Sequence, residues 1–454
     1  MEYDAIIIGG GQAGPALAGR LTAAGQTVAY VERHLMGGTC VNTGCMPTKT
    51  LVASAHAAHV VHRAAEFGVV LPSGEVRVDV ARAMERAHEV TRDSRQGLES
   101  WLNGMERLTL VRGHARFVSR HEVQVGSDHL MAKRIFINVG GRASRPAFPG
   151  IDKVPVLTNT TMLQVKELPE HLVVIGGSYI GLEFAQIFRR FGSQVTIVER
   201  SDRLVSREDP DVSGAIAEFL RTEGINVRLS AECIGFPSAK KVRVSCHAGE
   251  PEIEASHILL AVGRTPNTHD LGLEAAGIDV DTRGYITVDD ELKTSVDGVY
   301  ALGDCNGRGG FTHTAYNDFE IVAANLLDGE KRRVSDRFPV YALFTDPPLA
   351  RCGMTETEAR QSGRRVLMGV RPMTQVGRAV EKSETYGFMK VLVDADNELI
   401  LGASLLGTGC DEAIHCIIDV MSAKASYKTI TRAVHIHPTV AELIPTVLAD
   451  LHPL

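Results

Sequence analysis

Short apolar runs that end at glycines or acids give the start of the chain a regular pattern. The run from Tyr3 to Ile8 has the character of a strand and leads into Gly9-x-Gly11-x-x-Gly14. An alanine- and leucine-rich stretch follows, and then a second apolar run, 28–31, ends at Glu32. This order predicts a strand, a tight glycine turn, a helix and a second strand that carries an acid at its end.

The same pattern returns in the middle of the chain. The apolar run 172–175 precedes Gly176 and Gly181, with a serine in place of the middle glycine. After a predicted helix, the run 195–198 ends at Glu199. The chain therefore contains an internal repeat of one supersecondary unit, and each copy has the features of a dinucleotide-binding unit.

Later segments complete the predicted organisation. Apolar runs that end at Gly140 and Gly263 predict that the chain returns to each sheet beside its nucleotide, and a further run ends at Asp304. From about Pro339 onward, alternating segments and amphipathic helices carry no glycine fingerprint and predict a separate domain. We expect an α/β fold with two Rossmann-like domains and a C-terminal α+β domain. The predicted limits are 1–148 and 271–336 for the first domain, 149–270 for the second and 337–454 for the last.

The glycines of the first unit suit a bound dinucleotide. Gly9 allows the tight turn, Gly11 lets the backbone approach a pyrophosphate, and Gly14 lets the helix pack on the strand. Glu32 would accept hydrogen bonds from an adenosine ribose. Two such units in one chain suggest an electron relay between two dinucleotides, one of them a flavin.

The second unit gives mixed signals about its nucleotide. Glu199 would bind a free ribose diol and repel a 2′-phosphate. Arg200 and Arg203 follow closely and could pair with that phosphate. The sequence therefore slightly favours NADH and leaves NADPH open.

Two cysteines, Cys40 and Cys45, follow the first unit within a glycine-rich segment. We interpret them as a redox-active pair; a buried structural pair or half of a zinc site is the alternative, but no second pair or histidine cluster completes such a site. A predicted helix after them carries Lys49, and a helix N-terminus with a nearby positive charge lowers the pKa of a thiol. The other six cysteines are expected to be small, buried, apolar side chains: Cys233, Cys246, Cys305, Cys352, Cys410 and Cys416.

Composition narrows the classes of protein that fit. A length of 454 residues suggests two to four domains, and 44% hydrophobic with 23% charged residues is typical of a soluble globular protein. A net charge of -7 without a basic run argues against nucleic-acid binding. No apolar stretch is long enough for a bilayer and no targeting segment precedes the first strand, so we expect no membrane association and a cytoplasmic location.

Together these motifs resemble the flavin-dependent pyridine nucleotide-disulfide oxidoreductases over essentially the whole chain. The resemblance implies FAD in the first domain, NAD(P)H in the second and a homodimer formed through the third. It also implies the FAD-binding residues Gly9, Gly11, Gly14, Glu32, Gly38, Thr39, Lys49, Gly140 and Asp304. The implied nicotinamide-nucleotide site contains Gly176, Tyr179 as a gate, Gly181, Glu199, Arg200 and Gly263.

The resemblance also implies catalytic roles. Cys45 would face the flavin, and Cys40 would attack the substrate. An ion pair beside the flavin and an acid/base dyad, delivered across the dimer interface, would complete the site. The residues of the ion pair are Lys49 and Glu183, and those of the dyad are His437 and Glu442. His435 is expected to be structural.

Within that family the chain resembles the reactive-chlorine-resistance flavin reductases and the mercuric-reductase-like proteins, through residues 37–52 and 347–356. It ends at 451–454 without the cysteine pair of mercuric reductases, so efficient mercuric reduction is not expected. We expect an NAD(P)H-dependent reductase of a small disulfide or a hypohalous or hypothiocyanous oxidant. A mercuric or cupric ion reductase and a non-catalytic flavoprotein redox sensor are the alternatives.

Overall fold

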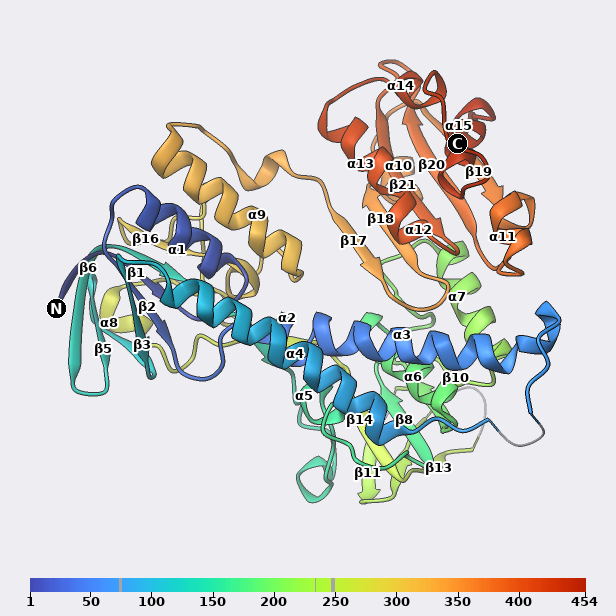
Figure 1. Cartoon of the computed structure of the whole chain (residues 1–454), viewed down its shortest axis with the longest axis horizontal. Helices are drawn as coiled ribbons and strands as arrows, with labels where there is room; N and C mark the ends of the chain where they lie inside the picture. Colours follow the sequence, from blue (N-terminus) through green and yellow to red (C-terminus); the bar gives the residue numbers. More distant parts are fainter. Residues whose placement is uncertain (73–75, 233, 246–249) are drawn as a thin grey trace.

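The computed structural model describes residues 1–72, 76–232, 234–245 and 250–454. It has three sheet-based parts: a first sheet on the left of Figure 1, a second sheet below the centre and a C-terminal sheet at the upper right. Two long helices, α3 (Cys45–His62) and α4 (Val80–Asn103), pack on each other and cross the molecule between these parts (Figure 1). The α/β class and the two Rossmann-like units are as predicted, while the exact domain limits stay predictions.

The first sheet is built around β1, which pairs in parallel with β2 and β6 so that Ile8 lies opposite Val31 and Ile137. The strand order is β3-β2-β1-β6-β5-β4, and β16, from much later in the chain, pairs with β6. The strands are β1 (Glu2–Ile8), β2 (Val28–Glu32), β3 (Leu108–Arg112), β4 (Ala115–Ser119), β5 (Glu122–Val125), β6 (Asp128–Ile137) and β16 (Val299–Ala301). Helices α1 (Ala13–Ala23) and α9 (Thr312–Ala323) pack against each other beside this sheet.

The second sheet repeats this arrangement in the order β10-β9-β8-β14, with Ile175 opposite Val198 and Leu260. Its strands are β8 (His171–Ile175), β9 (Gln194–Val198), β10 (Asn226–Arg228) and β14 (His257–Leu260). Its helices are α6 (Tyr179–Phe191) and α7 (Pro210–Thr222). Smaller sheets join β11 (Gly235–Ser238), β12 (Lys241–Arg243) and β13 (Glu252–Glu254), and β7 (Gly141–Ala143) with β15 (Arg264–Pro266).

Glycine is required at the turn after the first strand of both units. Gly9 has a φ of 104° and Gly176 a φ of 112°, and both angles lie in the region that favours glycine. A Cβ at either position would collide with a backbone carbonyl oxygen, that of Asn138 or that of Ala261. The predicted repeat of strand, glycine turn, helix and strand is therefore confirmed in its local geometry.

The C-terminal part is an antiparallel sheet in the order β17-β18-β21-β20-β19-β22. Its strands are β17 (Val340–Leu343), β18 (Leu349–Gly353), β19 (Val366–Pro372), β20 (Phe388–Asp394), β21 (Ile400–Leu406) and β22 (His452–Pro453). Its helices are α10 (Glu356–Gln361), α11 (Gly377–Glu381), α12 (Cys410–Ala413), α13 (His415–Ser422), α14 (Lys428–Thr431) and α15 (Ile444–Ala449).

Short elements connect these parts. They are α2 (Gly38–Thr43), α5 (Asn159–Met162), α8 (Leu273–Ala276), η1 (Ala64–Phe67), η2 (Ile151–Lys153), η3 (Gly303–Asn306), η4 (Ala324–Asp328), η5 (Val334–Asp336), η6 (Met373–Gln375) and η7 (Ala441–Leu443). In the described ranges no helix combines the length and the apolar character that a bilayer crossing would need.

One hydrophobic core crosses the boundaries between the parts. Leu51 of α3, Phe184 of α6 and Leu343 of β17 belong to the same cluster of buried residues. Because these helices and this strand come from different parts of the chain, their relative positions are set by shared packing.

An ionic cluster around one buried lysine also joins the second and C-terminal parts. Lys390 on β20 is almost fully buried, with a side chain 2% exposed, and its Nζ lies 2.8 Å from Asp211 Oδ2 and 3.0 Å from Glu356 Oε2. It also lies 3.3 Å from Asp209 Oδ2. The ammonium group occupies the point where these three carboxylates converge, so each charge has a partner.

We expect Lys390→Met to lower the free energy of unfolding by about 3–5 kcal/mol, because it leaves three carboxylates close together without their cation. Urea unfolding followed by circular dichroism measures this loss. Lys241→Met is the matched control: Lys241 pairs with Glu252 and Glu254, but its side chain is 41% exposed. That control should cost at most about 1 kcal/mol. Equal losses of unfolding free energy in the two variants would contradict the role of Lys390 in joining the second and C-terminal parts.

Candidate active site

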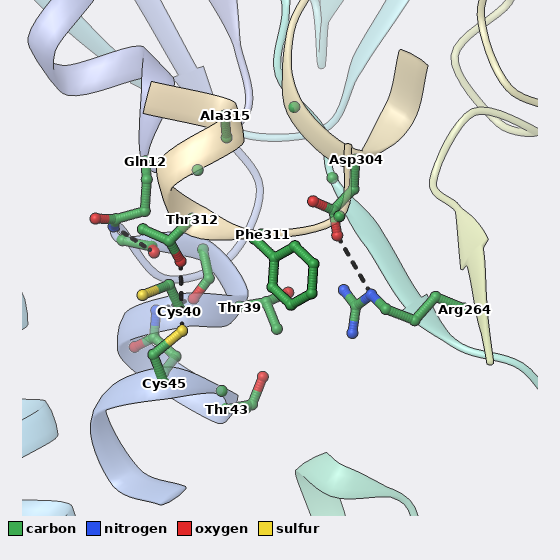
Figure 2. Close-up of a pocket in the computed structure, with 18 of the residues that line it drawn as sticks. Gln12, Thr39, Cys40, Thr43, Cys45, Arg264, Asp304, Phe311, Thr312 and Ala315 are labelled. Atoms are coloured by element: carbon green, nitrogen blue, oxygen red, sulfur yellow. Dashed lines mark hydrogen bonds and ion pairs between the residues drawn. The ribbon is translucent and has the colours of Figure 1, made fainter. Parts of the chain in front are cut away.

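Both cysteines of the predicted redox pair lie in helices. Cys40 lies inside the short helix α2 and precedes α3, the helix that carries Lys49, as predicted; Cys45 is itself the first residue of α3, so the expectation that it precedes that helix is corrected by one residue. Gly44 separates the two helices, and a Cβ there would stand 2.8 Å from the carbonyl oxygen of Thr39. This close approach lets the chain turn between the cysteines, and Figure 2 shows their sulfur atoms on the same side, beside Thr312.

The two thiols ionise very differently. A hydrogen bond from the Cys40 thiol lowers the pKa of Cys45 to about 6, against the opposing effect of burial. Thr312 and the positive charge of Lys49 act in the same direction. The same hydrogen bond, together with burial, raises the pKa of Cys40 well above its usual range. The reduced pair therefore holds one thiolate, on Cys45, and one thiol, on Cys40.

Thr312 contacts the thiolate from the opposite side of the cavity. Its Oγ1 lies 3.3 Å from Cys45 Sγ, and it is the first residue of α9. A helix N-terminus carries a partial positive charge, which stabilises a nearby anion. The thiolate is therefore stabilised by the starts of two helices, α3 and α9.

An ion pair joins the first and second parts next to the cysteines. Lys49 Nζ lies 2.8 Å from Oε1 and 2.7 Å from Oε2 of Glu183, whose side chain is 3% exposed. The Glu183 carboxylate also accepts a hydrogen bond of 3.0 Å from the backbone N–H of Phe344. The Lys49 ammonium lies 4.8 Å from the centre of the Phe344 ring. Three parts of the chain thus meet at one pair of charges.

The two predicted ribose-binding acids have matching environments. Glu32 accepts hydrogen bonds from the backbone N–H groups of Gly10, at 2.5 Å, and His34, at 2.6 Å. Glu199, in the second unit, accepts from two backbone N–H groups at 2.6 and 2.7 Å. These bonds fix each carboxylate at the end of its strand, and carboxylate oxygens keep lone pairs for further donors.

Asp304 lies at the other end of the same cavity. Its Oδ2 is 3.3 Å from Nε of Arg264, as the dashed line in Figure 2 marks. Burial raises the pKa of Asp304, and the charge of Arg264 opposes that rise. A half-buried acid beside a cationic side chain suits a site that binds a polar ligand.

One cavity of about 1210 Å³ connects these groups. The predicted residues that line it are Gly9, Gly11, Glu32, Gly38, Thr39, Cys40, Cys45, Lys49, Gly140, Tyr179, Glu183 and Asp304. The predicted residues that do not line it are Gly14, Gly176, Gly181, Glu199, Arg200, Gly263, His437 and Glu442. The cavity thus extends from the first glycine turn past the cysteine pair to the start of α6.

The predicted acid/base dyad forms, but away from this cavity. His437 Nδ1 lies 3.0 Å from both carboxylate oxygens of Glu442. The His437 side chain is 82% exposed, whereas that of Glu442 is 16% exposed. Val434 and Ile436, just before it, are exposed apolar side chains. The dyad is therefore presented at the surface of the C-terminal part.

The cavity also contains residues that the sequence did not single out. Phe311 and Thr312 lie at the start of α9, Tyr341 belongs to β17 and Phe344 follows it, and Arg264 begins β15. None of them lies in a recognisable motif for its role. Their only signal is their closeness in sequence to predicted strand ends, such as the glycine and acid at 303–304.

Three of the four remaining cysteines that the structure describes match the expectation of buried core residues, and Cys416 does not. Cys305, Cys352 and Cys410 are buried, and burial raises the pKa of each thiol to about 12. Cys416 is half-buried. Cys233 and Cys246 lie outside the described residues.

The residues of the cavity fit a flavin dinucleotide. At Gly9, Gly11 and Gly38, a Cβ would point against the neighbouring backbone or against Asn138, so the backbone itself can line the space for a pyrophosphate. Glu32 and Asp304 line the same cavity, and carboxylate oxygens keep lone pairs for further donors. Two acids and a glycine cradle are the groups that a dinucleotide needs.

Comparison with known proteins gives consistent matches. A family described as "Pyridine nucleotide-disulphide oxidoreductase" matches residues 3–318, and its dimerisation domain matches residues 340–448. The "Probable pyridine nucleotide-disulfide oxidoreductase RclA" of Escherichia coli is 37% identical over 97% of both chains. A mercuric reductase of Bacillus cereus is 35% identical over 91% of this chain and 66% of its own length.

A solved structure of high similarity is the "Cu(II) complex of HOCl-induced flavoprotein disulfide reductase RclA from Escherichia coli". Its sequence identity is 36% and its TM-score is 0.88, over 98% of this chain and 99% of that one.

The asymmetric ionisation of the cysteine pair can be measured directly. A thiolate absorbs at 240 nm, and the part of this absorbance that belongs to Cys45 is the part missing from the Cys45→Ser variant. In the reduced protein this part should increase as the pH is raised, with a midpoint near pH 6, because the pKa of Cys45 is lowered to about 6. Thr312→Val should move this midpoint to higher pH, since it removes a hydrogen bond to the thiolate. A midpoint above pH 8 in the unmodified protein would contradict this description.

Proposed function

The chain belongs to the pyridine nucleotide-disulphide oxidoreductases, and we propose that it reduces a small thiol-reactive oxidant through Cys40 and Cys45. The acceptor class is a small disulfide or a hypohalous or hypothiocyanous species. The observation that carries this proposal is the placement of the pair: Cys40 and Cys45 line one cavity together with the first glycine turn and the Lys49–Glu183 pair. The lowered pKa of Cys45 beside the raised pKa of Cys40 supports it. The similarity to an HOCl-induced flavoprotein disulfide reductase supports the oxidant class.

The family is dependent on FAD and a pyridine nucleotide, and FAD, when bound, supplies two-electron transfer between the nicotinamide and the cysteine pair. Gly9, Gly11 and Glu32 would hold its adenosine and pyrophosphate, and Asp304 its other half. The Lys49 ammonium would lie beside the redox-active ring, where Glu183 keeps its charge in place. Cys45, with the lower pKa, is the thiol suited to face that ring.

Cys40 is the thiol suited to attack the acceptor. Its sulfur forms a bond to the electrophilic atom of the oxidant, and the leaving group departs with the electron pair of the broken bond. The Cys45 thiolate then attacks the Cys40 sulfur, which forms the disulfide and releases the second fragment. The cysteine pair loses two electrons and the acceptor gains them. A further two electrons from NAD(P)H regenerate the dithiol.

This attack requires a base, because the pKa of Cys40 is raised and its thiol keeps its proton at neutral pH. We assign that role to His437, with Glu442 holding the imidazole through Nδ1. The dyad is exposed on the part of the chain that matches a dimerisation domain, and it does not line its own cavity. A homodimer in which His437 of one subunit serves Cys40 of the other accounts for both facts.

We propose NADH as the preferred donor. The Glu199 carboxylate is fixed by two backbone N–H groups at the strand end, where it would bind a ribose diol and repel a 2′-phosphate. Arg200 is exposed and can offset part of that repulsion, so NADPH should be used less efficiently.

A cytoplasmic location fits a cysteine pair that must stay reduced between turnovers.

Reduction of a metal ion is the second candidate function. One relative is a mercuric reductase, and one similar solved structure is a Cu(II) complex. The same two thiols would take up the ion, since thiolates bind soft metal ions strongly. The two functions differ in which acceptor is turned over faster.

An acceptor screen with NADH and NADPH in parallel tests this proposal. Hypochlorous and hypothiocyanous acids and small disulfides should be reduced faster than mercuric or cupric salts, with NADH preferred. Both Cys40→Ser and Cys45→Ser should lower turnover by about 100-fold or more, since each removes a reacting sulfur. Only Cys45→Ser should also remove the long-wavelength absorbance of the thiolate beside the flavin.

Cys416→Ser is the matched control for this screen, because Cys416 is a half-buried thiol outside the cavity. It should keep wild-type turnover. Full NADH-driven turnover in the absence of both Cys40 and Cys45 would refute the dithiol mechanism. Faster turnover of the metal salts would favour the second candidate.

Mixed dimers test the proposed exchange of His437 between subunits. A dimer of one Cys40→Ser subunit and one His437→Ala subunit keeps one complete site if the histidine acts across the interface, and should retain about half of wild-type turnover. A dimer of one wild-type and one doubly substituted subunit is the control and should be nearly inactive. The reverse result would show that His437 serves its own subunit.

A further inference from the structure

Four aromatic side chains gather on one wall of the cavity, and we call them the aromatic wall: Tyr179, Phe311, His313 and Tyr341. The ring of Tyr341 is nearly parallel to that of Phe311, at 6° and 5.6 Å between centres. The ring of His313 is also nearly parallel to Phe311, at 8° and 5.3 Å. Tyr179, the predicted gate, lies 5.5 Å from Phe311. Figure 2 shows the Phe311 ring between Thr39 and Arg264 in the view of the cavity.

The position of Tyr341 is fixed by a buried carboxylate. Its hydroxyl donates a hydrogen bond to Oε1 of Glu208, whose side chain is only 1% exposed. In the described part of the chain, the other oxygen, Oε2, has no hydrogen-bond partner and lies 3.7 Å from Nη1 of Arg351. Burying a carboxylate with so few partners is costly, and the one hydrogen bond that the Glu208 carboxylate accepts from a described residue is that of the Tyr341 hydroxyl.

Backbone hydrogen bonds connect Glu208 to the second glycine turn. The N–H of Glu208 donates to the carbonyl of Val205 at 2.7 Å, and the N–H of Val205 donates to the carbonyl of Gly177 at 2.9 Å. The N–H of Gly177 in turn donates to Glu199, the acid predicted to read the adenosine ribose. A series of hydrogen bonds therefore connects Glu199 to Tyr341, which belongs to the aromatic wall.

The residue after Glu208 holds this segment to the C-terminal part. Asp209 accepts hydrogen bonds from the N–H of Glu356 at 2.8 Å and from the N–H and hydroxyl of Thr357 at 3.0 and 2.8 Å. Tyr341, on β17, belongs to that same part. Glu208 is therefore held by its neighbour Asp209 and by Tyr341. A residue can set the position of another side chain only if its own position is fixed in this way.

We propose that Glu208 is a positioning residue for the nicotinamide half of the electron donor. By holding the Tyr341 hydroxyl, Glu208 fixes the plane of that ring against Phe311, and Phe311 limits how far the Tyr179 ring can turn. The aromatic wall then presents one arrangement to the nicotinamide, while Glu199, at the other end of the same chain of contacts, holds the adenosine. This inference rests on the proposed function, because it requires NAD(P)H to reduce a flavin in this cavity.

Rapid mixing of the holoenzyme with NADH tests the inference, with the limiting rate of flavin reduction and the dissociation constant of NADH as separate readouts. Tyr341→Phe keeps the ring and removes the hydroxyl, and should lower the limiting rate about tenfold through misalignment of the reacting atoms. The dissociation constant should change by less than about threefold, because the adenosine contacts remain. Glu208→Leu should reproduce both values.

Two further variants separate positioning from a general structural effect. Glu208→Gln keeps an acceptor oxygen for the Tyr341 hydroxyl, and its rate should stay within about twofold of wild type. Thr357→Ala removes only the hydroxyl bond to Asp209 and leaves the two bonds from the N–H groups of Glu356 and Thr357, so the segment stays anchored and the rate should match wild type. A wild-type rate in Tyr341→Phe, a Glu208→Gln variant as slow as Glu208→Leu, or an equally slow Thr357→Ala would each overturn the proposal.

Reduction by dithionite distinguishes this inference from the proposed function. It bypasses the nicotinamide, so the long-wavelength absorbance of Cys45 beside the flavin should form equally in wild type and in all four variants. If NADH and NADPH both fail to reduce the wild-type flavin, the proposed function fails. If wild type is reduced and the variants match it, only the role of Glu208 fails.

Discussion

The ion pair between Lys49 and Glu183 is the constraint on which the arrangement of the site depends. Lys49 belongs to the helix that starts at Cys45, and Glu183 belongs to the helix that starts at Tyr179. The carboxylate is buried and also accepts the N–H of Phe344. A buried charge is stable only with its partners in place, so α3, α6 and the C-terminal sheet must all reach their positions together.

The repeated units give the two ends of the relay the same local chemistry but different surroundings. Each unit ends its second strand at an acid fixed by two backbone N–H groups, and this acid is the residue predicted to bind an adenosine ribose. Around the first unit the chain adds the cysteine pair and the start of α9. Around the second it adds the segment that leads to Glu208. The difference between the two sites therefore lies in what surrounds the repeat.

Local sequence patterns were sufficient to predict the repeat, and twelve of the predicted site residues line the cavity. Glycines that require positive φ, apolar runs and the acids after them depend on neighbours within about 30 residues, which is the length of one unit. The redox pair and Lys49 were found because they follow the first unit directly.

The contacts that the sequence did not predict are non-local. Thr312 meets Cys45 only because α9 packs beside the first sheet, and Tyr341 meets Glu208 only because β17 lies against the second part. No spacing along the chain encodes such pairs. The helical position of Cys40 was missed for a different reason: it depends on the close approach at Gly44, which requires no special φ and leaves little trace in the sequence.

The cluster around Lys390 has a consequence for motion. Residues 208–211 are tied to the C-terminal sheet by Tyr341, by the N–H groups at the start of α10 and by Lys390 itself. A hinge between the second part and the C-terminal sheet would have to break all of these contacts at once. Under the proposed function, entry and release of a donor would then rely on the rotation of single side chains, which is a faster class of movement than the swing of a whole domain.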